Sequence, residues 1–150
     1  GAEPVGRAPR QWPWLLAGVA LGLAIMALAR RRPRLLATGA AGFWLACGLL
    51  GLVLVLSWAF TAHHALWANR NLLLLNPLCL LLLPGAWALL RGRTPSAGFL
   101  VLLIVVASLA ALACLPLWLQ GQPQRNGHWI ALLLPVHAAF AWAWSRRPRA

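Results

Sequence analysis

Residues 11–29 read QWPWLLAGVALGLAIMALA, residues 30–34 read RRRPR, and residues 35–60 read LLATGAAGFWLACGLLGLVLVLSWAF. Neither apolar run contains a charged residue. Because a helix rises about 1.5 Å per residue, roughly 17–25 apolar residues cross the hydrocarbon core of a bilayer, which is about 30 Å thick. The stretch therefore predicts two transmembrane helices joined by a short basic turn.

The composition of the whole chain agrees with this prediction. Of 150 residues, 62% are hydrophobic and 9% are charged, with 13 arginines and the single acid Glu3, a formal net charge of +12. Soluble domains are about 45–50% apolar and about 25% charged, so a soluble globular domain is excluded. The chain lacks the acidic residues that three kinds of site require: a pair of catalytic carboxylates, a carboxylate metal site and a Ser-His-Asp triad. The arginines form no continuous face, so we expect no nucleic-acid partner.

Three more apolar runs follow, at residues 71–90, 97–120 and 129–145. None contains a charged side chain apart from the flanking arginines. The predicted fold is therefore all-α, a polytopic membrane helix bundle of five transmembrane helices at residues 11–150. Residues 1–10 form a short exported segment before it. Because the chain begins at Gly1, we expect either a removed signal peptide or an exported domain upstream.

The arginines also predict an orientation, because cytoplasmic loops retain more arginine than exported loops. They are concentrated after the first, third and fifth runs. These three clusters are Arg30, Arg31, Arg32 and Arg34; Arg91 and Arg93; and Arg146, Arg147 and Arg149. The other side of the membrane receives the remaining four: Arg7, Arg10, Arg70 and Arg125. We expect the N-terminus outside and the C-terminus in the cytoplasm, in a bacterial inner membrane.

Tryptophan supports the same spans, because its ring favours the level of the lipid headgroups. Seven tryptophans lie at or near predicted span ends: Trp12, Trp14, Trp58, Trp67, Trp118, Trp129 and Trp144. Trp44 and Trp87 do not fit this belt.

Polar residues are concentrated between the second and third runs, at residues 60–78. Asn76-Pro77 is typical of a helix start, and a helix from there to Leu90 is too short to cross the membrane, so we expect a break near Asn76. One interpretation is a site for a phospholipid headgroup. The other is that the asparagines cap a re-entrant turn. The residues concerned are His63, His64, Asn69, Arg70, Asn71, Asn76 and Pro77.

This loop resembles the membrane region of bacterial proteins related to the Lnb-type lipoprotein N-acyltransferase. The matching pattern consists of Phe60, Thr61, His63, Asn69, Asn71, Leu72, Leu73, Asn76, Pro77 and Leu78. The resemblance covers about 20 residues strongly and the five-span pattern loosely. It implies that an exported catalytic domain with working Cys and His residues precedes the spans. No catalytic residue carries over to this chain, so we expect it to be non-catalytic.

Small and special residues predict details of the packing. Cys47, Cys79 and Cys114 lie in spans and are expected to be buried hydrophobes without a disulfide. The Gly18–Gly22 pair and the glycines at 39, 42, 48 and 51 predict close packing of the first span on the second. Pro84, Pro116 and Pro135 are expected to kink their spans.

The four histidines are the groups that titrate near neutral pH. His63, His64 and His128 fall on the predicted outer side. Without acids or ligand spacing beside them we expect interfacial hydrogen bonds and no metal. His137 lies near the middle of the fifth run. It is either an axial ligand of a tetrapyrrole, haem or a chlorophyll-type pigment, or a neutral imidazole bonded to a carbonyl, with Ala131 freed by Pro135 as the expected partner.

Two functions follow from these observations. The first is a membrane anchor that supports an exported domain or partner and holds a phospholipid headgroup at residues 60–78. The alternative is an accessory subunit of a larger respiratory or photosynthetic membrane complex that contacts a pigment through His137. The expected partners are membrane lipids and other membrane protein subunits or an exported domain.

Overall fold

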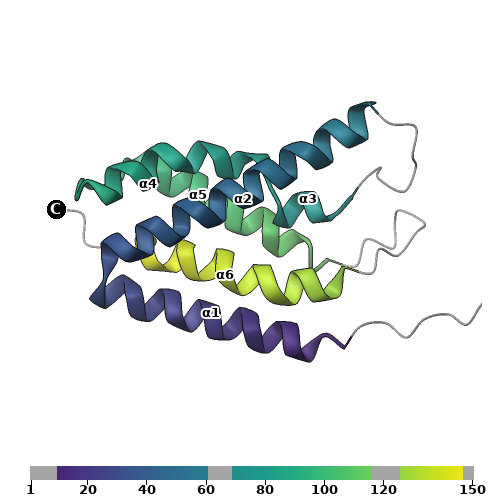
Figure 1. Cartoon of the computed structure of the whole chain (residues 1–150), viewed down its shortest axis with the longest axis horizontal. Coiled ribbons are helices and arrows are strands. Elements are labelled where there is room, and N and C mark those ends of the chain that lie inside the picture. The colour runs from purple at the N-terminus through teal and green to yellow at the C-terminus, as the bar shows by residue number, and fades with distance from the viewer. Residues whose placement is uncertain (1–9, 61–68, 116–125, 147–150) are drawn as a thin grey trace, which may run out of the picture.

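The computed structural model describes residues 10–60, 69–115 and 126–146. The regular structure of these residues is entirely helical, which confirms the all-α prediction (Figure 1). The elements are α1 (Trp12–Arg31), α2 (Pro33–Phe60), α3 (Asn71–Leu74), the 3₁₀ helix η2 (Pro77–Leu82), α4 (Leu83–Leu90), α5 (Ala97–Leu112) and α6 (Gly127–Ser145). Since α3, η2 and α4 form one interrupted segment, the elements amount to five helical segments.

Three segments of the described chain have the length and hydropathy of a membrane span. They are α1, α2 and the interrupted segment Asn71–Leu90. The helix α5 is also apolar but has only 16 residues. With 28 residues, α2 is the longest helix in the described chain.

The turn between α1 and α2 consists of one residue, Arg32. Its backbone leaves the helical conformation at φ −140° and ψ 65°, while its N–H still bonds the Leu28 carbonyl. Pro33 causes this break, because the ring of proline disfavours the α conformation in the residue before it and is well accommodated at the start of the next helix.

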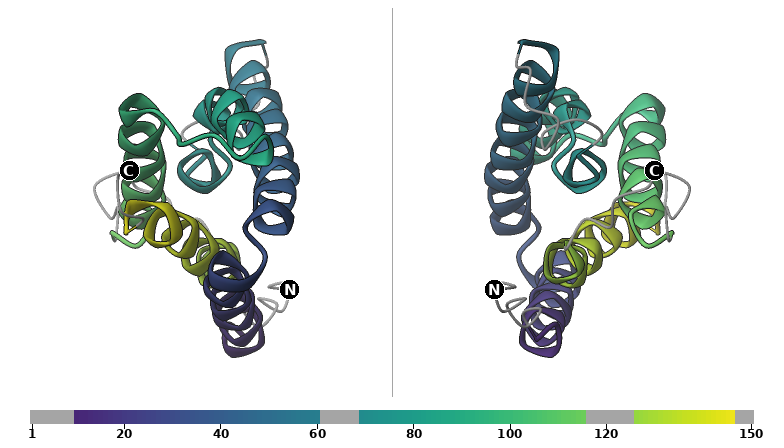
Figure 2. Two further views of the ribbon diagram at one scale, coloured as in Figure 1. Left: turned by 90° about the vertical axis from the view of Figure 1, so that its left-hand side faces the viewer. Right: turned by 90° about the vertical axis from the view of Figure 1, so that its right-hand side faces the viewer.

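Beyond this turn α1 packs mainly against α6, while α2 packs against the interrupted segment (Figure 2). The prediction that Gly18 and Gly22 pack on α2 was wrong. A Cβ added to Gly18 would lie 2.7 Å from the Leu132 carbonyl oxygen, and one added to Gly22 would lie 3.3 Å from that of Pro135. Both glycines therefore allow α1 to pack closely against α6. The spacing of glycines indicates close packing without naming the partner.

The helix α5 ends at Leu112, so the prediction of a helical span to Gln120 was wrong for residues 113–115. These residues form tight turns in which each N–H bonds the carbonyl three positions earlier. Pro116 follows these turns, and a proline there has no N–H to bond the Leu112 carbonyl and disfavours the α conformation at Leu115. Pro116 itself lies outside the described residues.

The other two prolines differ in their effect. We predicted that Pro84 kinks a continuous α-helix, and this was wrong. Pro84 lies in the first turn of α4, next to the end of η2. Pro135 does lie inside α6.

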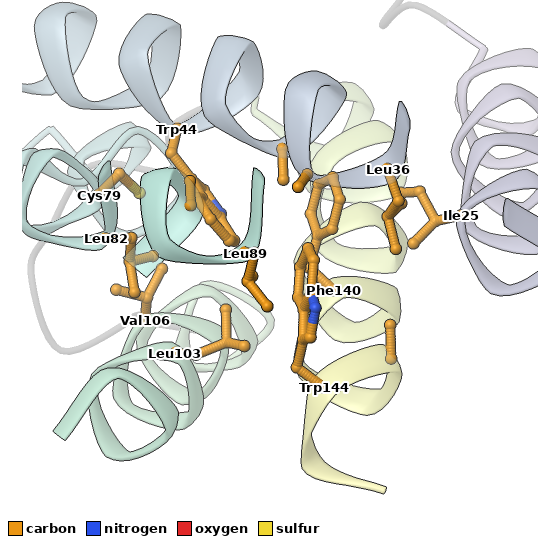
Figure 3. Close-up of a cluster of buried hydrophobic side chains, with 14 of the residues drawn as sticks. Ile25, Leu36, Trp44, Cys79, Leu82, Leu89, Leu103, Val106, Phe140 and Trp144 are labelled. Carbon is orange, nitrogen blue, oxygen red and sulfur yellow. The ribbon is translucent and has the colours of Figure 1, made fainter. Parts of the chain in front are cut away.

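The core is aromatic, with Trp44, Phe99, Phe140 and Trp144 packed together (Figure 3). The rings of Phe140 and Trp144 stack with centroids 5.7 Å apart. Trp144 is 1% exposed, so its predicted place in an interfacial belt was wrong. One reason is that the side chain lies on the face of α6 that also carries Phe140, four residues earlier.

The cysteines divide between core and surface. Cys47 and Cys79 are buried as free thiols, as expected. Cys114 is exposed, contrary to the prediction, because it follows the end of α5.

The described arginines of the three predicted clusters lie at one end of the bundle, where α1, α4 and α6 end and α2 and α5 begin (Figure 1). A guanidinium nitrogen of Arg34 lies near Gly92, in the turn between α4 and α5. Arg91 lies over the ring of Trp87 at 4.6 Å. Residues 69–71, which begin the interrupted segment, lie at the opposite end.

Candidate functional site

The interruption of the third segment lies at Leu75 and Asn76, as predicted. The backbone of Asn76 is extended at φ −101° and ψ 126°, and its side chain accepts a hydrogen bond from the Leu78 N–H at 2.9 Å. The 3₁₀ helix η2 then begins at Pro77, which has no N–H to satisfy. Asn76-Pro77 therefore starts a new helix inside the segment.

The break leaves several backbone carbonyls without their normal helical partners, and the Leu74 carbonyl is one of them. In an unbroken α-helix the Leu78 N–H would bond the Leu74 carbonyl, four residues earlier. Here Asn76 binds that N–H, and His137 Nε2 donates to the Leu74 carbonyl at 2.8 Å. Two side chains thus replace this one helical hydrogen bond, and both its donor and its acceptor are satisfied.

His137 reaches Leu74 from the middle of α6. Its side chain is 2% exposed, and its ring meets that of Phe43 edge-on with centroids 5.1 Å apart. Because a carbonyl oxygen only accepts hydrogen bonds, Nε2 carries the proton. This bond engages Nε2, one of the two nitrogens that could ligate the metal of a tetrapyrrole.

The expected bond to a carbonyl is therefore present, but the expected partner, Ala131, was wrong. Pro135 does remove the N–H that would bond Ala131. Position 137 is six positions after 131, which places the two about 120° apart around the helix, on different faces. The Ala131 carbonyl instead points towards Gly18 of α1, where a Cβ atom would collide with it.

Glycines of α2 allow the break to approach closely. A Cβ added to Gly51 would collide with the Leu75 carbonyl oxygen and lie 2.8 Å from Cδ of Pro77. One added to Gly48 would lie 3.0 Å from the Leu80 nitrogen. Gly51 therefore belongs to the site, although the sequence analysis did not name it as a site residue. The only signal in the sequence was its position in a glycine-rich run.

The polar turn before α3 has asparagines at both ends. Asn69 Oδ1 accepts from the Asn71 N–H at 3.0 Å, and the Asn69 carbonyl accepts from the Leu72 N–H. Asn71 Oδ1 is buried without a hydrogen-bond partner. Arg70 lies half-buried between the two asparagines.

These contacts divide the predicted site residues into two groups. Asn76 is 6% exposed and shapes the break together with Pro77. Asn69, Arg70 and Asn71 form a separate turn nearer the end of the segment. His63, His64 and Thr61 lie outside the described residues.

A further polar group surrounds the start of α6. His128 lies against Trp14 and Trp129, with ring centroids 5.5 and 5.4 Å apart. Asn126 is 6% exposed, and its Nδ2 has no hydrogen-bond partner. Within the described ranges no three His, Cys, Asp or Glu side chains converge as a metal site would require.

A family model described as the Lnb transmembrane domain matches residues 3–147. The chain belongs to this family. The match extends the resemblance seen at residues 60–78 to nearly the whole chain and establishes a five-helix, multi-pass membrane domain. In this Lnb transmembrane domain, the break at Asn76 falls in the part of the sequence that carried the resemblance. No curated protein and no solved structure gave a match.

Proposed function

We propose that this Lnb transmembrane domain is a non-catalytic module that anchors an exported domain and holds a phospholipid headgroup at its outer end. The observation that carries the proposal is the exchange of hydrogen bonds at the break. It holds the Asn69–Asn71 turn on a helical segment that is locked to both α2 and α6. A rigid support of this kind is what a binding turn requires.

The chemistry of the turn matches a zwitterionic headgroup. The guanidinium of Arg70 provides the donors and charge that a phosphate prefers. Asn71 Oδ1 is a buried acceptor without a donor, and an ammonium group such as that of phosphatidylethanolamine would supply one. The Leu78 amide is already bonded to Asn76, so the headgroup belongs at residues 69–71 and not at the start of η2.

The test compares Arg70→Ala with Arg93→Ala, which removes the same charge at the opposite end. Each variant of the whole chain is reconstituted in nanodiscs with equal amounts of phosphatidylethanolamine and phosphatidylglycerol, and bound lipid is counted by native mass spectrometry. Because one charge-assisted contact is worth about 1.5–3 kcal/mol, Arg70→Ala is expected to lower occupancy by phosphatidylethanolamine about tenfold or more. Arg93→Ala is expected to leave it unchanged. Equal occupancy in both variants and the parent contradicts the proposal.

A further inference from the structure

An apolar groove of about 380 Å³ lies between α1, α2 and α6, in the halves of α1 and α2 that adjoin the Arg32 turn. Only apolar residues line it. On α1 the lining runs from Leu21 to Leu28, and on α2 it runs from Leu35 to Phe43. The groove thus begins beside the Arg30–Arg34 turn and extends about 10 Å along α1, towards the middle of the membrane.

The groove follows from the packing of the two first helices. Gly18 and Gly22 draw α1 onto α6, so α1 and α2 diverge after their one-residue turn. Gly39 faces the resulting wedge without a side chain, and a Cβ built there would have no atom within 4 Å. Ile25, Leu36 and Val136 form buried parts of its wall.

Four arginines lie within the five residues 30–34, which follow Leu28 and precede Leu35 of the groove lining, namely Arg30, Arg31, Arg32 and Arg34. The part of the chain that the structure describes contains no Asp or Glu, and the whole sequence contains only Glu3. Anions that balance this turn must therefore come largely from outside the chain. An amphiphile with an anionic headgroup and an alkyl tail matches both the charge of the turn and the apolar groove.

We propose that this groove binds one acyl chain of an anionic phospholipid, whose phosphate is held by the Arg30–Arg34 turn. The ligand class is a phosphatidylglycerol-type lipid, because a zwitterionic lipid carries no net charge for the arginines to select. This site lies at the other end of the bundle from Arg70 and does not depend on the proposed function.

The decisive variant is Gly39→Leu, which places a side chain in the groove from a position whose Cβ would have no atom within 4 Å. Its matched control is Gly42→Leu, since Gly42 is also exposed on α2 with open space around its Cβ position and does not line the groove. The whole chain is reconstituted with equal phosphatidylglycerol and phosphatidylethanolamine, and retained lipids are counted by native mass spectrometry. Gly39→Leu is expected to lower the occupancy by phosphatidylglycerol at least fivefold, and Gly42→Leu is expected to leave it unchanged. Equal loss in the two variants, or no loss in either, overturns the proposal.

Charge selection is tested by Arg30→Gln, Arg32→Gln and Arg34→Gln in combination. The preference for phosphatidylglycerol over phosphatidylethanolamine is expected to fall by about fivefold for each arginine that contacts the phosphate, which corresponds to about 1 kcal/mol per arginine. An unchanged ratio overturns the selection of an anionic lipid. Arg70→Ala is expected to lower the count of phosphatidylethanolamine and to leave that of phosphatidylglycerol unchanged, so failure here is distinguishable from failure of the headgroup site at residues 69–71.

The unmodified chain provides a measurement that does not depend on folding of a variant. A phosphatidylglycerol with a diazirine at the end of one acyl tail is expected to crosslink mainly to residues 21–28, 35–43 and 132–140 under ultraviolet light. Peptide mapping by mass spectrometry locates the products. Crosslinks spread evenly over the exposed faces of α2 and α5 overturn the proposal.

Discussion

At the scale of single residues, the Leu74 carbonyl and the Leu78 N–H are the groups on which the site depends. Each has lost the other as a partner, and each is satisfied by a side chain, from His137 and Asn76. A buried carbonyl without a donor lowers the stability of the fold by about 1–3 kcal/mol, and the hydrogen bond from His137 avoids this loss at the break.

The substitution His137→Leu is expected to lower the free energy of unfolding by about 1–3 kcal/mol, because it leaves the Leu74 carbonyl unpaired. His137→Gln retains an N–H donor and is expected to lose less. Unfolding of the chain in mixed micelles with increasing SDS measures both. A visible absorption band in the parent that disappears in His137→Leu would instead support the pigment-binding alternative.

The partner variant Asn76→Ala provides the control for this interpretation. In the double variant with His137→Leu, the second substitution acts on a turn that the first has already loosened, because the Leu78 N–H and the Leu74 carbonyl belong to the same broken hydrogen bond. The two losses are therefore expected to be non-additive, with the double variant more stable than their sum by about 0.5–3 kcal/mol. Simple additivity would show that the two side chains do not act on one broken hydrogen bond.

At the scale of elements, local signals predicted where most helices lie and where one of them breaks, but not which helices pack together. The break at Asn76 was predictable because a capping asparagine followed by proline acts within a few residues. The bond from His137 to Leu74 was not, since it joins positions 63 apart in the sequence. Likewise Gly18 indicated close packing, whereas only the course of α1 shows that its partner is α6.

The contact of α2 with the break leads to a prediction at Gly51. In an exposed helix, Gly→Ala stabilises by about 0.4–1 kcal/mol, and Gly42→Ala is expected to behave in this way because its Cβ position is open. Gly51→Ala is expected to have the opposite effect and to lower the free energy of unfolding by about 1–3 kcal/mol, because the added methyl collides with the Leu75 carbonyl. The same SDS titration compares the two, and a stabilised Gly51→Ala would show that the approach is not tight.

At the scale of the whole molecule, the alternation of arginines in the sequence corresponds to one arginine-rich end of the bundle. The five-segment architecture was predictable because long apolar runs and their flanking charges are strong signals in membrane proteins. The expected orientation, with the N-terminus outside, remains a prediction for experiment.

Orientation can be measured with a membrane-impermeant maleimide in intact cells. In a Cys114→Ser background, Cys47 and Cys79 are buried and are expected not to react. Arg10→Cys is expected to react from outside, and Arg93→Cys only after the membrane is permeabilised. The reverse pattern would place the arginine-rich end outside and contradict the positive-inside argument.

The unequal helices of the α1–α2 hairpin have a further consequence. At about 1.5 Å per residue, the 28 residues of α2 span about 42 Å, whereas the 20 residues of α1 span about 30 Å and match a typical hydrocarbon core. A single-residue link prevents α2 from sinking without α1. The additional length of α2, about 12 Å, requires either that α2 tilts or that its end with Trp58 and Phe60 rises to the level of the lipid glycerol and phosphate groups. Both of these side chains are exposed. Thinner bilayers would increase this hydrophobic mismatch, so membrane thickness becomes a variable that sets the height of the Phe60 end of α2 above the hydrocarbon core.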